Sequence, residues 1–170
     1  MIVILMGVSG AGKTAVGERL AARLGWAFHD GDDFHPEANV RKMAAGEPLD
    51  DEDRRPWLAA IRELLAAHER EGTDAVVACS ALKESYRSYL LSGAPSARTV
   101  YLRGTPALIE ERLSRRRGHF FRADLLASQF ASLEEPSSAL VVDVDAELDV
   151  VVARVLAALD LSDLGSRRSR

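Results

Sequence analysis

The sequence predicts an α/β fold built on a mostly parallel sheet, and two observations carry this prediction. Short apolar runs with the character of buried strands alternate along the chain with segments of helical periodicity, which is the pattern of repeated βαβ units. The first apolar run, Ile2–Met6, leads directly into a glycine-rich loop at residues 7–14, and a helix-forming segment follows. A strand, a glycine turn and a helix in this order are typical of a nucleotide phosphate site.

Hydrophobic patterning places the individual elements. Strands are expected at residues 2–6, 26–29, 75–79, 99–102 and 140–142. Helices are expected at residues 13–24, 36–45, 53–71, 81–91, 106–116, 123–133 and 148–159. In the helix at 53–71 the apolar residues recur at helical spacing, and Pro56 is expected in its first turn, where proline is tolerated.

Composition and charge narrow the class of protein. The chain has 170 residues, 47% of them hydrophobic and 28% charged, which suits one domain with a full core. We expect this domain at residues 1–160 and a frayed tail at 161–170. No apolar run approaches the roughly 20 residues of a membrane span, and the start of the chain lacks the basic leader of a signal peptide. The net charge of −4 argues against nucleic acid as main partner, and the single cysteine, Cys79, suits the reducing cytoplasm.

The glycine-rich loop fits the pattern G-x-x-x-x-G-K-[ST], whose backbone N–H groups bind a polyphosphate. Its residues are Gly7, Val8, Ser9, Gly10, Ala11, Gly12, Lys13 and Thr14. Lys13 is placed to reach the β- and γ-phosphates, and the Thr14 hydroxyl is placed to hold Mg²⁺. The loop therefore predicts binding of a nucleotide such as ATP.

An acidic cluster follows the second strand, at the sheet edge where ligands of open α/β folds bind. Asp30 and Asp32 lie two residues apart, so an extended segment would point them the same way. Asp32 is the candidate base for an acceptor hydroxyl and a candidate Mg²⁺ ligand, because Gly31 lets the backbone turn there. The alternative for this cluster is an acidic loop that caps the helix after Pro36, with Asp33 as the cap. His35 could donate to a substrate oxygen or simply stand at a helix start.

Three basic residues are candidates for binding an anionic acceptor. Arg54, or in its place its neighbour Arg55, could turn inward and pair with a carboxylate, or form a surface ion pair within its acidic surroundings. Lys83 and Arg87 lie four residues apart, so they could offer two cations near the phosphate loop or form a solvated basic face. The third strand ends in Cys79 without a metal-binding aspartate, so Thr14, phosphates, water and Asp32 are left to hold the metal.

An arginine-rich segment around residues 112–117 is too densely charged for a core. A lid at about residues 112–133 would need such arginines to neutralise the phosphoryl group during transfer. Arg112 and Arg116 share a helix face and are the best pair for that role. The alternatives are a nucleic-acid patch or a plain basic surface.

Taken together, these motifs resemble those of bacterial gluconokinases, small phosphate-loop kinases that phosphorylate D-gluconate at its 6-hydroxyl. The matching segments, between residue 2 and about residue 159, are GVSGAGKT, DGDDFHP, MAAGEPLDDEDRRPWL, CSALKESYR, RRRGHFF, QFASLEEP and VVDVDAEL. The resemblance implies a nucleoside-monophosphate-kinase-like fold with strand order 2-3-1-4-5 and a lid, use of ATP and Mg²⁺, and a homodimer.

Carried over to this chain, the resemblance also implies which residues surround or close over gluconate. They are Asp32, His35, Arg54, Lys83, Arg87 and His119. Two rival readings stay open on the sequence alone. One is a kinase of the same fold acting on shikimate or a nucleotide, and the other is a nucleotide-binding switch without transfer activity.

Overall fold

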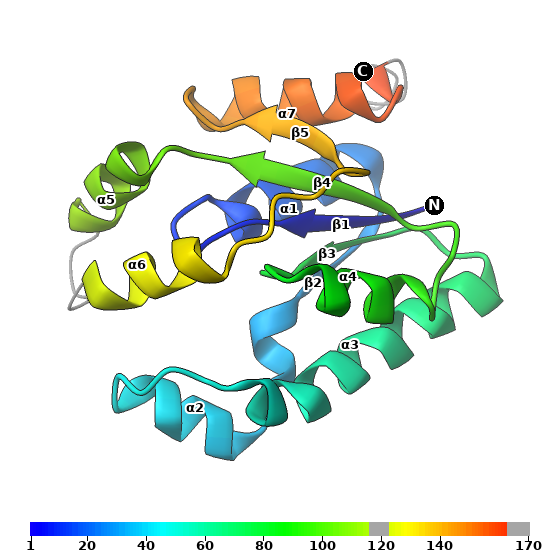
Figure 1. The fold of residues 1–170 in the computed structure, drawn as a ribbon. Helices are drawn as coiled ribbons and strands as arrows, with labels where there is room; N and C mark the ends of the chain where they lie inside the picture. The colour runs from blue at the N-terminus through cyan, green and yellow to red at the C-terminus, as the bar shows by residue number, and fades with distance from the viewer. Residues whose placement is uncertain (116–122, 163–170) are drawn as a thin grey trace.

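The computed structural model describes residues 1–115 and 123–162 and contains one five-stranded parallel sheet (Figure 1). The strands are β1 (Ile2–Met6), β2 (Ala27–Asp30), β3 (Ala75–Ala78), β4 (Arg98–Arg103) and β5 (Leu140–Asp143). Their order in the sheet is β2-β3-β1-β4-β5, which confirms the predicted order. The predictions for Arg116, His119 and most of the tail concern residues outside the described part of the chain.

Helices cover both faces of the sheet (Figure 1). They are α1 (Lys13–Leu24), the 3-10 turn η1 (Gly31–Phe34), α2 (Glu37–Ala44), α3 (Asp51–Glu71), α4 (Glu84–Leu91), α5 (Pro106–Ser114), α6 (Ala123–Ser132) and α7 (Leu148–Ala158). Helices α1 and α7 pack on one face, and α3 and α4 pack on the other. None of the helices in the described ranges is long and apolar enough to cross a membrane.

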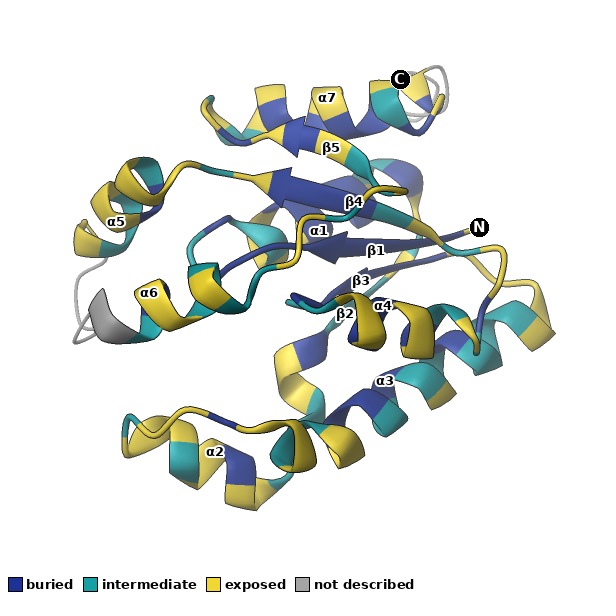
Figure 2. Cartoon of the chain, viewed as in Figure 1, coloured by how far each residue is buried: buried dark blue, intermediate teal, exposed yellow. Residues whose placement is uncertain are grey.

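The central strand β1 shows why the core has two halves. All five of its residues are buried, as expected for a parallel strand covered on both faces. Val3 and Leu5 join the apolar cluster beneath α1 and α7, whereas Ile2, Ile4 and Met6 join the cluster beneath α3 and α4. This alternation follows from the two-residue period of a strand, and Figure 2 shows the buried residues concentrated in the sheet and on the inward sides of its helices.

The start of α3 differs from the sequence prediction. The helix begins at Asp51, because Asp50 and Asp53 form a reciprocal capping box that extends it by two residues. Pro56 is therefore the sixth helical residue and not part of the first turn. Its missing N–H leaves the carbonyl of Glu52 without the usual helical partner, and both residues are exposed, so water can bond to that carbonyl.

Two further predictions, one for a helix start and one for a helix cap, are wrong. Helix α4 begins at Glu84 and not at 81, because Ala81 adopts a positive φ of 42° and Lys83 is an extended N-cap. Asp33 does not cap the helix that follows it, since the N-cap of α2 is Pro36 and no side chain bonds there. It is Asp30 whose side chain caps η1, by accepting from the backbone N–H of Asp32.

Candidate active site

The glycine-rich loop lies between β1 and α1, at the carboxyl edge of the sheet where α5 and α6 also lie (Figure 1). Gly12 is the N-cap of α1 with a φ of 90°, a conformation that favours glycine. The first N–H groups of α1 have no intrahelical partner and form the positive end of the helix dipole. The Lys13 ammonium lies over this loop, 3.0 Å from the carbonyl oxygen of Gly7 and 3.1 Å from that of Val8. The loop thus presents the donors and the cation that a polyphosphate requires.

Asp30, and not Asp32, contacts the hydroxyl that the sequence assigns to the metal. The Thr14 hydroxyl donates to Asp30 Oδ2 at 2.7 Å, and Asp30 Oδ1 accepts from the Asp32 N–H at 3.0 Å. The prediction that both aspartates point the same way is wrong, because β2 ends at Asp30 and η1 begins at Gly31. Gly31 also lets η1 approach β3, since a Cβ there would lie 2.5 Å from the Ala78 carbonyl oxygen.

Thr14 and Asp30 fit a magnesium ion better than a transition metal. Among the described residues there is no cluster of three or more histidine, cysteine or acidic side chains that could hold a metal. Mg²⁺ is usually held by one or two protein oxygens together with phosphate oxygens and water. A hydroxyl and a carboxylate beside a phosphate loop satisfy that requirement.

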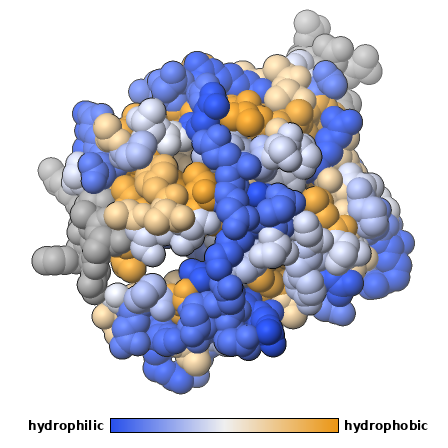
Figure 3. Space-filling view, in the orientation of Figure 1, coloured by the Kyte–Doolittle hydropathy of each residue, from blue (hydrophilic) through white to orange (hydrophobic). Residues whose placement is uncertain are grey.

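A cavity of about 260 Å³ adjoins the phosphate loop on the side of η1, α2 and α6. In the space-filling view an opening lies between the region around α2 and the part of the molecule above it (Figure 3). The polar side chains that line the cavity come from five separate segments and are Ser9, Lys13, Asp32, His35, Glu47, Arg54, Ser80, Ser128 and Gln129. Acidic, basic and neutral hydrogen-bonding groups therefore meet beside the phosphate site, as expected for a pocket that binds a polar acceptor.

Only one of the three candidate anion-binding residues lines this cavity. Arg54 does so, and among the described residues it forms no ion pair, its closest recorded partner being the Tyr86 ring at 6.0 Å. The Lys83 ammonium instead binds the Asp51 carboxylate at 2.7 and 2.9 Å. Hydrogen bonds from Lys83 and Tyr86 lower the pKa of Asp51 below its usual range.

Arg87 is a structural residue in this arrangement. Its side chain is only 4% exposed and donates to the Glu84 carboxylate at 2.7 Å and to the carbonyl oxygens of Ala81 and Leu82 at 3.0 and 2.9 Å. These bonds hold the β3–α4 loop in its irregular course. The expectation of two cations offered to the acceptor by Lys83 and Arg87 thus finds no support in the geometry, because both groups are paired elsewhere.

His35 lies against Trp57 at the edge of the cavity. The two rings stack with centroids 4.5 Å apart and an interplanar angle of 7°. Burial lowers the pKa of His35, the nearby Arg54 lowers it further and Asp32 acts in the opposite direction. His35 therefore faces the acceptor cavity as a neutral imidazole at neutral pH.

A second cavity, of about 360 Å³, lies on the opposite side of the phosphate loop and extends to the β5–α7 loop. Arg112 on α5 donates to the carbonyl oxygens of Val144 and Ala146, the latter at 3.2 Å. Arg112 thus lines this cavity and not the acceptor cavity. The position suits the nucleoside part of a nucleotide whose phosphates lie in the loop.

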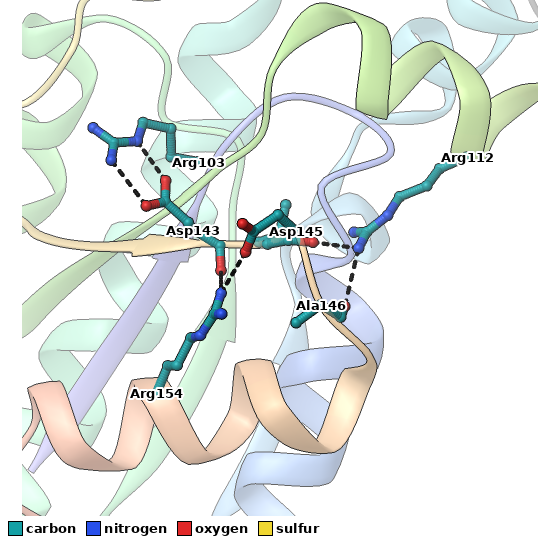
Figure 4. A network of polar contacts seen from close by, with 7 residues as sticks. Arg103, Arg112, Asp143, Asp145, Ala146 and Arg154 are labelled. Carbon is teal, nitrogen blue, oxygen red and sulfur yellow. Dashed lines mark hydrogen bonds and ion pairs between the residues drawn. The ribbon is translucent and has the colours of Figure 1, made fainter.

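Charged pairs brace the β5–α7 loop (Figure 4). The Arg103 guanidinium binds the Asp143 carboxylate through two hydrogen bonds, at 2.6 and 3.0 Å. Arg154 on α7 donates to the Asp143 carbonyl oxygen at 2.7 Å and to the Asp145 carboxylate at 2.5 Å. These bonds fix Asp143 and Asp145, the neighbours of Val144 in the wall of the second cavity.

Sequence reasoning missed Gln129 on α6, whose side-chain oxygen accepts from the Ser9 N–H at 2.7 Å. That N–H belongs to the phosphate loop and could donate to a phosphate oxygen. In this structure it donates instead to the uncharged side-chain oxygen of Gln129. The two residues are 120 positions apart, and nothing local to either predicts the contact. The only sequence signal is the position of Gln129 within the QFASLEEP segment that contributes to the resemblance.

Comparisons with known proteins show the family to which the chain belongs. The model of the shikimate kinase family matches residues 9–146. The thermoresistant gluconokinase of Escherichia coli strain K12 is 46% identical over 159 residues, which cover 91% of each chain. The chain belongs to the gluconokinase family. Shikimate kinase shares the fold at lower identity, since the crystal structure of the enzyme from Aquifex aeolicus aligns with a TM-score of 0.61 at 18% identity, covering 97% of this chain and 99% of that one.

Further relatives agree with the gluconokinase assignment and show that it is not confined to bacteria. A probable gluconokinase of Xenopus tropicalis is 42% identical over an alignment 178 positions long, and the alignment covers 94% of each chain. The crystal structure of a gluconokinase from Sinorhizobium meliloti aligns with a TM-score of 0.86 at 43% identity, covering 99% of this chain and 97% of that one. As a member of the gluconokinase family the chain is a phosphate-loop kinase, which removes the alternative of a switch without transfer activity.

Proposed function

We propose that this protein transfers the γ-phosphoryl group of ATP to the 6-hydroxyl of D-gluconate, giving 6-phospho-D-gluconate and ADP in the breakdown of sugar acids. The observation that carries this proposal is the joint presence of Arg54, Asp32 and Lys13 around one cavity beside the phosphate loop. The relatives named as gluconokinases support the identity of the acceptor.

The nucleotide would lie across the phosphate loop. Its phosphates would bind the N–H groups at the start of α1 and the Lys13 ammonium, and its nucleoside would lie in the cavity beside Arg112. Binding of the phosphates requires the Ser9 N–H to exchange the Gln129 oxygen for a phosphate oxygen.

The acceptor cavity matches the chemistry of gluconate. Gluconate carries one carboxylate and five hydroxyls, so its site needs one cation and several hydrogen-bonding groups. Arg54 supplies the cation, since a guanidinium pairs with a carboxylate through two parallel hydrogen bonds. Asp32, His35 and Gln129 supply groups for the hydroxyls. A site built in this way rejects acceptors that lack those hydroxyls, because its own polar groups would remain unpaired.

In the transfer step the 6-oxygen forms a bond to the γ-phosphorus while the bond from that phosphorus to the bridging oxygen of ADP breaks. Asp32 aligns the hydroxyl and accepts its proton. Lys13 balances the charge on the phosphoryl group. The predicted participation of Arg116 and His119 concerns residues outside the described ranges and stays a proposal.

Mg²⁺ is the metal that this donor set would hold, through the Thr14 hydroxyl and the Asp30 carboxylate, with Asp32 nearby. When bound, the ion supplies positive charge to the phosphate oxygens. We further propose one kinase domain at residues 1–160 with a lid at about 112–133, a cytoplasmic location and a homodimer. The dimer is supported by the family resemblance, and the cytoplasm by the single, buried Cys79.

An acceptor panel tests the proposed function. ATP consumption would be measured with purified protein and Mg²⁺ in the presence of D-gluconate, shikimate or AMP, and without any acceptor. The proposal predicts turnover that depends on gluconate and exceeds the acceptor-free rate by several orders of magnitude. Turnover with shikimate or AMP but not with gluconate would overturn it.

A further inference from the structure

Asn39 is one of two buried polar or charged residues in the described part of the chain, and it lies on helix α2, whose other residues are exposed or, at Lys42, half-buried. The Asn39 side chain is 4% exposed. The side-chain nitrogen Nδ2 lies 2.7 Å from the backbone carbonyl oxygen of Asp53 in the first turn of α3. The same nitrogen lies 3.4 Å from Nδ1 of His35. A buried amide between a carbonyl and an imidazole must satisfy both of them, since unpaired buried polar groups are costly.

The carbonyl of Asp53 determines which way the Asn39 amide faces. A carbonyl oxygen only accepts hydrogen bonds, so the group 2.7 Å away must be the NH₂ and not the amide oxygen. The reversed amide would place two acceptors against each other at that distance. The NH₂ group has a second hydrogen, and the nitrogen nearest to it on the His35 ring is Nδ1, 3.4 Å from Asn39 Nδ2.

The orientation of the amide in turn determines where the proton of His35 resides. A nitrogen that faces an NH₂ donor must offer a lone pair, so Nδ1 of His35 is unprotonated and the neutral ring carries its proton on Nε2. We infer that Asn39 is a positioning residue that fixes His35 as the Nε2–H tautomer, so that His35 presents an uncharged N–H donor to an oxygen of the sugar-acid acceptor. The part of this inference that concerns the acceptor rests on the proposed function.

Whereas Asn39 fixes the tautomer of His35, Trp57 fixes the plane of the His35 ring. Its indole is 1% exposed, donates through Nε1 to the Gly31 carbonyl oxygen at 2.6 Å and stacks flat on His35. A ring that is stacked on one side and bonded at Nδ1 has one orientation open to it. The cavity then has a division of roles, in which Asp32 accepts a proton and His35 donates a hydrogen bond.

Imidazole ¹⁵N chemical shifts measure this inference without any substrate. The chain has four histidines, and the signals of His35 are identified by their loss in His35→Gln. At neutral pH we expect Nδ1 of His35 to show the shift of an unprotonated nitrogen and Nε2 that of a protonated one. A wild-type spectrum with the proton on Nδ1, or on both nitrogens, would overturn the inference whether or not gluconate is turned over.

Asn39→Asp tests the causal role of the amide. A carboxylate beside Nδ1 attracts a proton to that nitrogen, so Nδ1 should become protonated, and the KM for gluconate should rise by about 3- to 10-fold through loss of the preset neutral donor. The KM for ATP should stay within twofold of wild type. An unchanged tautomer in a folded Asn39→Asp variant would contradict the inference.

Lys42→Met is the matched control. The Lys42 ammonium binds the Asp53 carboxylate at 2.6 Å, so this change also removes a bond between α2 and α3 but leaves Asn39 and His35 intact. We expect the tautomer and the KM for gluconate to remain as in wild type. If Lys42→Met raised that KM as much as Asn39→Asp, the effect would come from displacement of α2, and Asn39 would have no specific role.

Discussion

Replacing Arg54 by methionine should weaken gluconate binding far more than replacing either of the other two candidate cations. The guanidinium of Arg54 lines the acceptor cavity and forms no ion pair with any described residue. Lys83 and Arg87 are committed to Asp51 and Glu84. Methionine keeps much of the length of the arginine side chain and removes only its charge and its hydrogen-bond donors.

The expected size of the effect follows from the bond that is lost. A hydrogen bond to a charged group is worth about 1.5–3 kcal/mol, and each 1.4 kcal/mol corresponds to about a tenfold change in an equilibrium constant. Arg54→Met should therefore raise the KM for gluconate by about 10- to 150-fold. The carboxylate of gluconate lies at the far end of the molecule from its 6-hydroxyl, so kcat should fall less than KM rises.

Steady-state kinetics with two acceptors separate this effect from general damage. D-glucitol carries a hydroxymethyl group where gluconate carries its carboxylate, so Arg54→Met should leave the weaker turnover of D-glucitol within about threefold. Arg55→Met is the matched control, because Arg55 is exposed and, among the described residues, pairs only with exposed Glu52. An unchanged KM for gluconate in Arg54→Met, together with a raised one in a folded Lys83→Met, would refute the assignment.

Three further predictions concern single residues: Asp30, His29 and Cys79. Asp30→Asn keeps an oxygen for the Asp32 N–H but removes the negative charge beside Thr14. In a magnesium titration, the Mg²⁺ concentration for half-maximal activity should therefore rise about 10-fold or more. An unchanged titration would argue against Asp30 as a ligand. Burial and the neighbouring His68 lower the pKa of His29 below its usual 6.5, so the unfolded chain takes up more protons in that range. The free energy of unfolding in urea should therefore be highest above about pH 6.5 and should fall as the pH drops through the folded-state pKa of His29. The fall should be smaller in His29→Gln, and an equal fall in both proteins would contradict this. Burial raises the pKa of Cys79 to about 12, so its thiol should react with a disulfide reagent at pH 8 only on unfolding, and rapid reaction of the native protein would show that it is accessible.

The sheet and the phosphate loop could be predicted from the sequence because their signals are local. The buried run of β1, the glycine spacing and the helix after it lie within about 25 residues, and each step follows from backbone geometry. The residue at which the second strand ends is harder to predict from the sequence. Whether Asp30 and Asp32 face the same way depends on the single residue at which β2 gives way to η1, and patterns place element boundaries only to within a few residues.

The partners of charged side chains could not be predicted, because they depend on contacts between distant segments. Lys83 looks like a possible substrate ligand in its own segment, but its carboxylate partner Asp51 lies 32 residues earlier. The contact between Gln129 and Ser9 spans 120 residues. Such pairings follow from the packing of α3 against α4 and of α6 against the phosphate loop, neither of which is written in a local pattern.

Phosphorus NMR of the reaction product tests the proposed transfer most directly. The protein would be incubated with ATP, Mg²⁺ and D-gluconate, and the phosphorus signal of the product would be correlated with its protons. Transfer to the 6-hydroxyl predicts a phosphate ester whose phosphorus couples to the two protons of one CH₂ group, formed in equal amount to ADP. Formation of ADP with free inorganic phosphate alone, or of an ester coupled to a single CH proton, would contradict it.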